Sequence, residues 1–255
     1  MTIESLMIAY GLIVIVLIIS WHNQLTLDKE IAVASLRATV QLVIMGFLLE
    51  MILKLDNYVY LGLILLAMTA IAAAISGRRG RKIPHATGIA FTGILIGSVI
   101  TFTVLASAGV IGPEAKYIIP MGGMIIGNSM NASSLSMNRL IGELGHQRKR
   151  IETLLALGAN ARQASEWAVR QSVRSALIPV IDSMKIIGLV HLPGIMTGFI
   201  IAGGSPQEAV KYQLAIMFMI AGTASLTCVI VTLLAARRCF TRELQLLDTF
   251  RPSTA

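Results

Sequence analysis

The sequence predicts an all-α polytopic membrane protein with about seven transmembrane helices, and three observations lead to that prediction. The first is composition: hydrophobic residues make up 55% of the 255-residue chain, charged residues only 13%, and the mean hydropathy is +0.77. Soluble domains carry about 25% charged residues. The second is that the apolar residues gather in stretches close to the ~20 residues that a helix needs to cross a bilayer. The third is the distribution of basic residues along the chain.

Seven stretches of the chain have, or nearly have, the length and apolar character of a membrane-spanning helix. They are residues 4–21, 31–53, 58–76, 86–107, 118–137, 187–203 and 209–236. The sixth is the weakest, because it is short, rich in glycine and interrupted by Pro193, and its sequence leaves open whether the span is continuous or broken. We expect the whole chain, residues 1–255, to form a single transmembrane domain.

The basic residues are distributed unevenly between the loops that join these stretches. If the N-terminus lies outside, most of the 21 Lys and Arg residues fall on the inner side, and only Lys54, Lys116 and Lys211 fall on the outer side. Cytoplasmic loops of membrane proteins carry such an excess of positive charge. We therefore expect an N-out, C-in arrangement in a bacterial-type cytoplasmic (inner) membrane, and we attribute the net charge of +8 to topology rather than to nucleic acid binding.

The longest connection between spans, residues 138–186, is basic and has helical periodicity, so we expect a cytoplasmic hairpin of two helices between the fifth and sixth spans. Gly158 is suited to end the first helix, because glycine adopts the left-handed conformation common just after a helix. Asn160 and Gln163 have the spacing of a capping box that begins the second helix. Such a hairpin would couple the membrane domain to a partner. The alternative is an ordinary solvated pair of surface helices.

Charged and aromatic residues of this connection are candidates for contact with that partner. Arg162, Glu166 and Arg170 follow one another at four-residue spacing and so share one helical face. Trp167 lies elsewhere on the same helix and suits an interfacial or docking position. The candidate coupling residues are Glu152, Gly158, Arg162, Glu166, Trp167 and Arg170.

The fifth stretch is the most polar of the seven, and we expect it to line a translocation path. Four of its residues share a helical face: Met121, Met124, Asn128 and Asn131. Amide groups within a bilayer need protein or water as hydrogen-bonding partners. Thioethers favour soft metal ions, which makes Met124, Met130 and His191 weak candidate metal ligands. The alternative is that the methionines fill gaps between helices.

Ionisable residues elsewhere extend the candidates for the path. Arg37 lies inside the second stretch, Gln41 follows it on the same helical face, and Asp182 lies near the end of the basic connection. An ionisable residue within a span is a functional candidate, although Arg37 can also extend its side chain to the cytoplasmic headgroups. An ion-coupled transporter or channel, a competing interpretation, would use Arg37 and Glu50 as its charged pair.

Three stretches contain glycines four residues apart, a spacing that lets helices approach closely within a bilayer. The pairs are Gly93 with Gly97, Gly123 with Gly127, and Gly194 with Gly198. We expect these pairs to form either a tight bundle or a dimer face.

The sequence lacks the motifs of a catalytic subunit. It contains no Gly-x-x-x-x-Gly-Lys-Ser/Thr loop for nucleotide phosphates, no nucleophile elbow and no His-Glu-x-x-His zinc motif. We therefore expect no enzymatic activity and no cofactor bound by this chain. Active transport would then draw on an ion gradient or on a partner protein.

Several sequence blocks resemble those of known permeases. Glu152-Thr-Leu-Leu-Ala-Leu-Gly158 is similar to the Glu-Ala-Ala-x3-Gly coupling loop of ABC importer permeases in the spacing of Glu and Gly, and departs from it at both alanines. A closer resemblance covers essentially the whole chain, and its blocks are Ile118-Ile-Pro-Met-Gly-Gly-Met-Ile-Ile-Gly-Asn-Ser-Met130, Leu157-Gly-Ala159, Arg174-Ser-Ala-Leu-Ile-Pro-Val-Ile-Asp-Ser-Met-Lys185 and Gly188-Leu-Val-His-Leu-Pro-Gly-Ile-Met-Thr-Gly198. On these blocks the chain resembles the FetB-type ABC transporter permeases, a family that includes bacterial iron-export permeases and plant aluminium-tolerance half-transporters.

This resemblance implies a permease subunit that forms a homodimer and pairs with a cytosolic ABC ATPase subunit, on which ATP and Mg²⁺ would bind. It also implies export of iron or another metal. Because the plant members are associated with a sugar nucleotide, a non-metal substrate is an alternative. A structural membrane assembly factor is a third interpretation, and it would show neither an ATPase partner nor gradient-driven flux.

Overall fold

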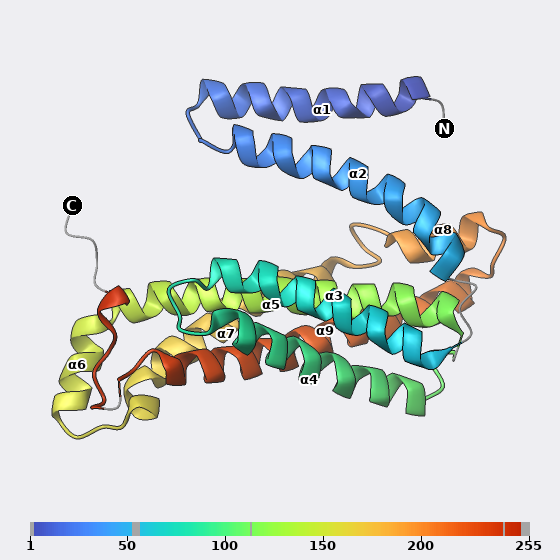
Figure 1. Ribbon diagram of the computed structural model, residues 1–255. Helices are drawn as coiled ribbons and strands as arrows, with labels where there is room; N and C mark the ends of the chain where they lie inside the picture. Colours follow the sequence, from blue (N-terminus) through green and yellow to red (C-terminus); the bar gives the residue numbers. More distant parts are fainter. Residues whose placement is uncertain (1–2, 53–56, 113, 242, 251–255) are drawn as a thin grey trace. The chain divides into compact units, whose positions relative to one another are not determined.

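The computed structural model describes residues 3–52, 57–112, 114–241 and 243–250 (Figure 1). The described residues are almost entirely helical and divide into two compact units, Met1–Asp56 and Asn57–Ala255. The all-α prediction is therefore confirmed.

The smaller unit consists of α1, Ile3–His22, and α2, Asp28–Ile52, which are joined by a short turn and pack against each other. The Tyr10 hydroxyl contacts the Thr39 hydroxyl across this pair. Most of the large apolar side chains on both helices are exposed, including Leu36 and Phe47. Such surfaces suit contact with hydrocarbon rather than with water.

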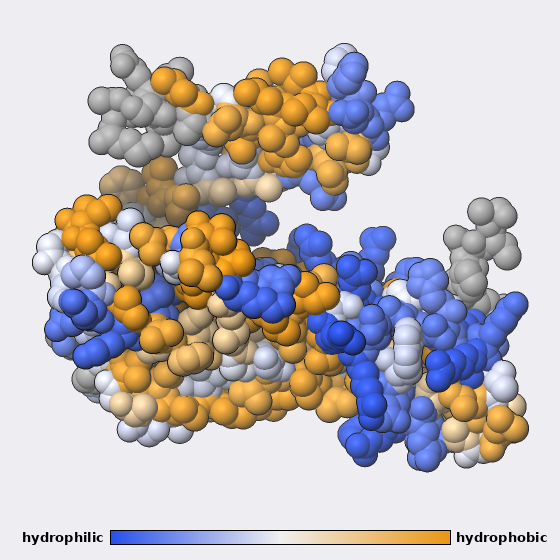
Figure 2. All heavy atoms as spheres, turned by 180° about the vertical axis from the view of Figure 1, so that it is seen from behind, coloured by the Kyte–Doolittle hydropathy of each residue, from blue (hydrophilic) through white to orange (hydrophobic). Residues whose placement is uncertain are grey.

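The larger unit is a bundle of five long helices, which Figure 1 shows running beside one another. They are α3 (Tyr58–Arg79), α4 (Ala86–Ser107), α5 (Ala115–His146), α7 (Ala161–Ile186) and α9 (Pro206–Arg238). Two short helices, α6 (Arg148–Ala156) and α8 (Gly194–Ile201), lie in the connections, and a 3₁₀ turn, Asp248–Phe250, follows α9. On the face seen in Figure 2, hydrophobic residues cover the middle of this unit, and hydrophilic residues gather most densely toward the end that carries α6.

Four described helical segments are long and apolar enough to cross a membrane: Asp28–Leu49 of α2, and all of α3, α4 and α9. The apolar part of α1, Tyr10–His22, is shorter. These segments support a polytopic membrane protein. The number of spans and the N-out, C-in orientation stay predictions.

The region of the sixth predicted span differs from expectation. Residues 187–203 contain only the eight-residue α8, about 12 Å long, which is too short to span. The 26-residue α7, about 39 Å long, instead packs along α5 and α9. The second half of α7 therefore packs in the bundle rather than in a separate hairpin, and the cytoplasmic placement of residues 138–186 stays a prediction. The charged residues of α7 keep its mean hydropathy low, so sequence reasoning assigned it to a connection, although its length is comparable to that of the other bundle helices.

The packing of α7 places its second half at the level of the middle of α5 and α9. Its side chains there contact small residues of both neighbours: Val173, Leu177 and Val180 lie against Ala132, Ala224 and Cys228. Only the first turns of α7 remain with α6 in the connection. The hairpin available to a partner is therefore shorter than expected.

The glycine pair Gly93 and Gly97 brings α4 and α9 into close contact, as predicted. A Cβ atom on Gly93 would overlap with Val231, and one on Gly97 would overlap with the Thr227 hydroxyl. The other two pairs differ. Nothing lies within 4 Å of a Cβ built on Gly127, Gly194 or Gly198, and one on Gly123 would meet only Met68, at 3.5 Å.

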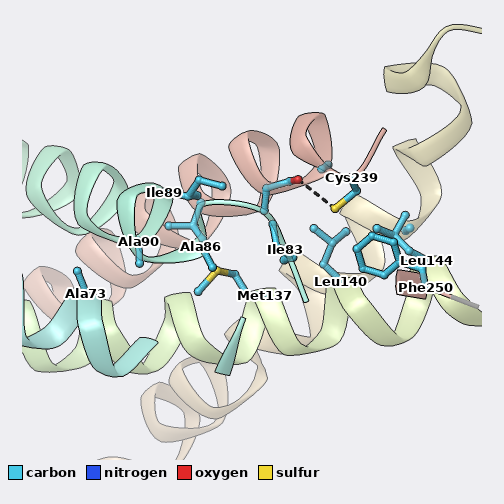
Figure 3. Packing of buried hydrophobic residues seen from close by; sticks show 14 of the residues in the cluster. Ala73, Ile83, Ala86, Ile89, Ala90, Met137, Leu140, Leu144, Cys239 and Phe250 are labelled. Carbon is cyan, nitrogen blue, oxygen red and sulfur yellow. Dashed lines mark hydrogen bonds between the residues drawn. The ribbon is translucent and has the colours of Figure 1, made fainter. Parts of the chain in front are cut away.

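A large buried cluster fills the α6 end of the bundle and includes the segment that follows α9 (Figure 3). Phe250 and Leu246, in that segment, are buried against Leu140 and Leu144 of α5. The Cys239 thiol, at the end of α9, donates to the Ala235 carbonyl at 3.1 Å, and burial raises the pKa of Cys239 to about 12. The segment after α9 is therefore part of the core.

Candidate functional site

The corner between α6 and α7 has the backbone that the sequence predicts. Gly158 adopts φ of +92°, and the amides of Gly158 and Ala159 donate back to the carbonyls of Leu155 and Leu154, each at 3.0 Å. These bonds satisfy the last carbonyls of α6 and turn the chain sharply. Two candidate features, a glycine that ends the first helix and a separate second helix, are confirmed.

Asn160 and Gln163 form the predicted capping box at the start of α7. The Asn160 side chain accepts from the Gln163 amide at 2.9 Å, and the Gln163 side chain accepts from the Asn160 amide at 2.9 Å. Two amides of the first turn are thereby satisfied. The corner is consequently well defined rather than loose.

A groove of about 220 Å³ lies between α6 and the first half of α7, and three candidate coupling residues, Glu166, Trp167 and Arg170, line it. Trp167 is 44% exposed, and the Arg150 guanidinium lies 6.0 Å from its ring centre. Glu166 and Arg170 form an ion pair at 2.5 Å. An exposed indole flanked by an ion pair and by an arginine that lies over its ring is typical of a surface that binds protein.

Glu152 points away from that groove toward the chain segment after α9. It accepts from Arg148 at 2.6 Å, and Arg148 also contacts the Leu247 carbonyl and the Asp248 carboxylate, each at 3.5 Å. Arg162 is exposed. The six candidate coupling residues therefore share the α6–α7 region, but Glu152 contributes to its attachment to the bundle.

The candidate path residues on α5 lie at a partly open face of that helix. Met121, Met124 and Asn128 are partly buried, whereas Asn131 is exposed. Met124 packs with Met219 of α9, and the Asn128 amide donates to the Met124 carbonyl at 2.8 Å. The exposed Asn131 amide in the middle of a bundle helix is the most unusual feature of this face.

Buried hydroxyls connect α5 and α9 to their neighbours, and no sequence pattern indicates these pairs. Ser133 accepts from Ser76 of α3 at 2.8 Å, and Thr227 donates to Ser129 at 3.2 Å. The hydroxyls of Thr223 and Thr101 lie 2.8 Å apart between α9 and α4. Single serines and threonines in apolar helices carry no signal of their partners, so only the packed structure identifies them.

The weak candidate metal ligands are not assembled into a site. Met130 packs in the large cluster at the α6 end, Met124 packs in a different one, and His191 is exposed in the connection after α7. Asp182 is also exposed and pairs with Lys185 at 3.1 Å. Within the parts of the chain that the structure describes, no group of three or more His, Cys, Asp or Glu side chains could hold a metal ion.

Arg37 and Gln41 both lie on α2 and are exposed in the smaller unit. Nothing in that unit pairs with Arg37 among the described residues. The Glu50 side chain lies outside the described residues, so the proposed pairing of Arg37 with Glu50 stays a prediction.

Comparison with known proteins relates these features to a family. The sequence model described as "Uncharacterised protein family (UPF0014)" matches residues 3–240. The chain belongs to this family. The match includes α1 and α2 as well as the whole five-helix bundle, so both compact units are part of the UPF0014 pattern.

Curated UPF0014 relatives match along nearly their whole length. The "Probable iron export permease protein FetB" of Escherichia coli is 39% identical over 246 residues, which cover 96% of this chain and 95% of that protein. The "Protein ALUMINUM SENSITIVE 3" of Arabidopsis thaliana is 36% identical over 240 residues, covering 93% and 88%. The "UPF0014 membrane protein YjkA" of Bacillus subtilis is 37% identical over 242 residues, covering 95% and 97%. No solved structure matches.

These relatives confirm the resemblance to FetB-type permeases and the assignment to a membrane protein. For this UPF0014 chain, sequence reasoning did not single out two residues of the α6–α7 region. The first is Leu157, 79% exposed at the corner itself, and the second is Arg148, which links α6 to the segment after α9. An exposed leucine beside a left-handed glycine is a detectable signal, whereas the Arg148 contact joins residues about one hundred positions apart.

Proposed function

We propose that this chain is the permease subunit of an ABC exporter that moves iron or another metal across a bacterial inner membrane, powered by a separate ATPase subunit. The name of the E. coli relative supports the cargo and the direction. The absence of a phosphate-binding loop from the sequence supports a partner that binds ATP and Mg²⁺. A homodimer with cytoplasmic α6–α7 corners completes the proposal.

The observation that carries this proposal is the exposed α6–α7 corner. Leu157 at its tip and Trp167 beside it present apolar surface that the described residues leave exposed, at the end of the bundle that also carries the basic α3–α4 turn. A partner that buries both side chains would remove them from water. The groove beside Trp167 supplies charged groups of both signs for orientation.

The path in this proposal follows the partly open face of α5. That helix is continuous from Ala115 to His146, about 48 Å, so it connects Asn131 to the start of α6 and, through α6, to the corner. Movement of the corner would tilt α5 and α7 together, since α6 is linked to both by short turns. Gly142 and Gly145 near one junction, and Pro179 in α7, supply candidate hinges.

The coupling role is tested with Gly158→Val in the full permease and its ATPase. A β-branched residue at φ of +92° is strained by about 1–3 kcal/mol, which should deform the corner but leave the bundle folded. We expect ATP hydrolysis to continue while ATP-dependent metal uptake into inverted vesicles, which reports export, falls at least about tenfold, a coupling loss of ~1.4 kcal/mol or more.

Gly109→Val is the matched control, because Gly109 has φ of +69° and open space around its Cβ position, but lies in the α4–α5 turn. It should keep efflux near the unaltered level. Normal efflux by Gly158→Val would contradict the coupling role.

An ion-coupled transporter or channel is the competing function. Purification of the protein distinguishes this function from that of an ABC exporter. Co-elution with a nucleotide-binding subunit, and flux that requires ATP, support the ABC exporter. Gradient-driven flux by this chain alone in liposomes would overturn it. A sugar nucleotide is the alternative cargo. It is added to the same vesicles to test whether it competes with ATP-dependent metal transport.

A further inference from the structure

A hollow at the α6 end of the bundle lies outside the coupling region and the path. It is formed between the start of α4 and the end of α9, has a volume of about 660 Å³, and is lined by His85, Gly88, Ile89, Thr92, Leu234, Arg237 and Arg238. Its two arginines and its position at the end of two apolar helices distinguish it from the gaps within the bundle.

The side chains that line this hollow are either cationic or neutral. Arg237 and Arg238 are exposed, and no ion pair involves either of them among the described residues. No acidic side chain lines the hollow. Two unpaired guanidinium groups provide fixed forks of donors that suit phosphate oxygens.

The start of α4 adds donors on the opposite wall. His85 is the residue before the helix, and its side chain caps none of the amides of the first turn. Those amides have no acceptor within the helix. At Gly88, nothing lies within 4 Å of a Cβ position, so space beside the first turn is open to a ligand. His85 and Gly88 at the start of α4 and the two arginines at the end of α9 thus line one volume from two helices.

An apolar surface continues from the hollow along both helices. On α4, Thr92 is followed on the same face by Ile96 and Val99, which are 40% and 54% exposed. On α9, Leu234 is preceded at four-residue spacing by Ile230, partly buried, and Leu226, exposed. A ligand with an anionic head and long apolar chains fits this combination better than a soluble anion does.

We propose that this hollow binds the headgroup of an anionic phospholipid of the cytoplasmic leaflet, with its acyl chains along the exposed faces of α4 and α9. Basic pockets between membrane helices bind such headgroups through phosphate contacts and surface potential. The placement in the cytoplasmic leaflet rests on the orientation proposed above. Lipid selectivity itself depends only on the hollow and does not require the exporter function.

Native mass spectrometry of the full permease, purified with equal amounts of phosphatidylglycerol and phosphatidylcholine, tests the proposal. We expect the unaltered chain to retain phosphatidylglycerol preferentially. The double variant Arg237→Gln and Arg238→Gln should lose at least about fivefold of that preference, since each cation near a membrane surface contributes to binding an anionic lipid. Both arginines are exposed, so the bundle should fold normally.

Two further variants separate a defined site from general charge. Arg78→Gln with Arg79→Gln removes the same charge from the exposed end of α3, outside the hollow, and should keep the preference. Gly88→Leu keeps every charge but fills the hollow, and should lose the preference. An equal loss in the α3 variant, or full retention in the Arg237 and Arg238 variant or in Gly88→Leu, would overturn the proposal.

Inorganic phosphate distinguishes the lipid from a free anion. Millimolar phosphate should leave bound phosphatidylglycerol in place, because acyl chains contribute about 0.8 kcal/mol per buried methylene to lipid binding. Displacement of the lipid by phosphate at that concentration would identify a soluble-anion site instead and would overturn the lipid assignment.

Discussion

Two regions of the bundle carry the same glycine spacing and use it differently. Between α4 and α9, Gly93 and Gly97 lie against Val231 and Thr227 with no space for a methyl group. On α5, a Cβ on Gly127 would meet nothing, and Asn131 four residues later is exposed. The α4–α9 contact is thus complete within the larger unit, whereas the α5 face is left open within that unit.

This difference shows that glycine spacing permits close approach but does not determine whether the approach occurs within a chain. What distinguishes the two regions is the polarity beside the glycines. Thr101 and Thr223 next to the α4–α9 contact are buried and bonded to each other, but the side-chain amide of Asn131 beside Gly127 makes no hydrogen bond among the described residues. The exposed amide indicates that the α5 face is completed by something else.

The largest effect is expected for Gly97→Ala. The added methyl group overlaps with Thr227, so α4 and α9 must separate, at a cost of about 1–3 kcal/mol in the free energy of unfolding. Thermal unfolding in detergent measures the loss. Gly127→Ala, with open space at its Cβ, is the matched control and should change stability by less than about 0.5 kcal/mol. Equal losses in both variants would remove the distinction between the two regions.

A smaller and different effect is expected for Asn131→Leu. Because Asn131 is exposed, stability should stay within about 0.5 kcal/mol, but ATP-dependent efflux should fall several-fold if its amide lines the path. Val104→Leu, at an exposed apolar position of α4, controls for an altered helix surface. Unchanged efflux by the Asn131 variant would show that the open face of α5 contacts only lipid or a second chain.

The smallest effect is expected for Thr223→Val. Thr101 still donates to the Gly97 carbonyl when its partner hydroxyl is removed, so no buried donor is left without an acceptor. The free energy of unfolding should therefore fall by about 1 kcal/mol or less. A loss as large as that of Gly97→Ala, measured in the same melting experiment, would mean that the hydroxyl pair rather than the glycine holds the two helices together.

Local sequence signals predicted the features that depend on neighbouring residues. The left-handed end of α6 at Gly158 and the capping box at Asn160 and Gln163 each involve contacts within a few positions, and both are confirmed. The close approach at Gly93 and Gly97 was also predictable, since it requires only small residues on one face.

Features that depend on distant partners were not predictable in this way. Sequence reasoning expected a long sixth helix at residues 187–203 and assigned α7 to a separate hairpin, because the charges of α7 lower its hydropathy, although α5 and α9 cover the side of α7 that carries Ala176. Likewise, Leu246 and Phe250 follow the last long helix in an irregular segment, and no periodicity indicates that they are buried. Tertiary packing determines both outcomes.

The contact between Arg148 and the segment after α9 has a mechanical consequence. Arg148 at the start of α6 bonds the Leu247 carbonyl, and the same segment inserts Phe250 beside Leu144. A displacement of α6 is therefore passed to α9 from its C-terminal end as well as to α5 and α7 through the adjoining turns. A single displacement of α6 would then move three long helices together. Residues 246–250 would provide the link between α6 and α9.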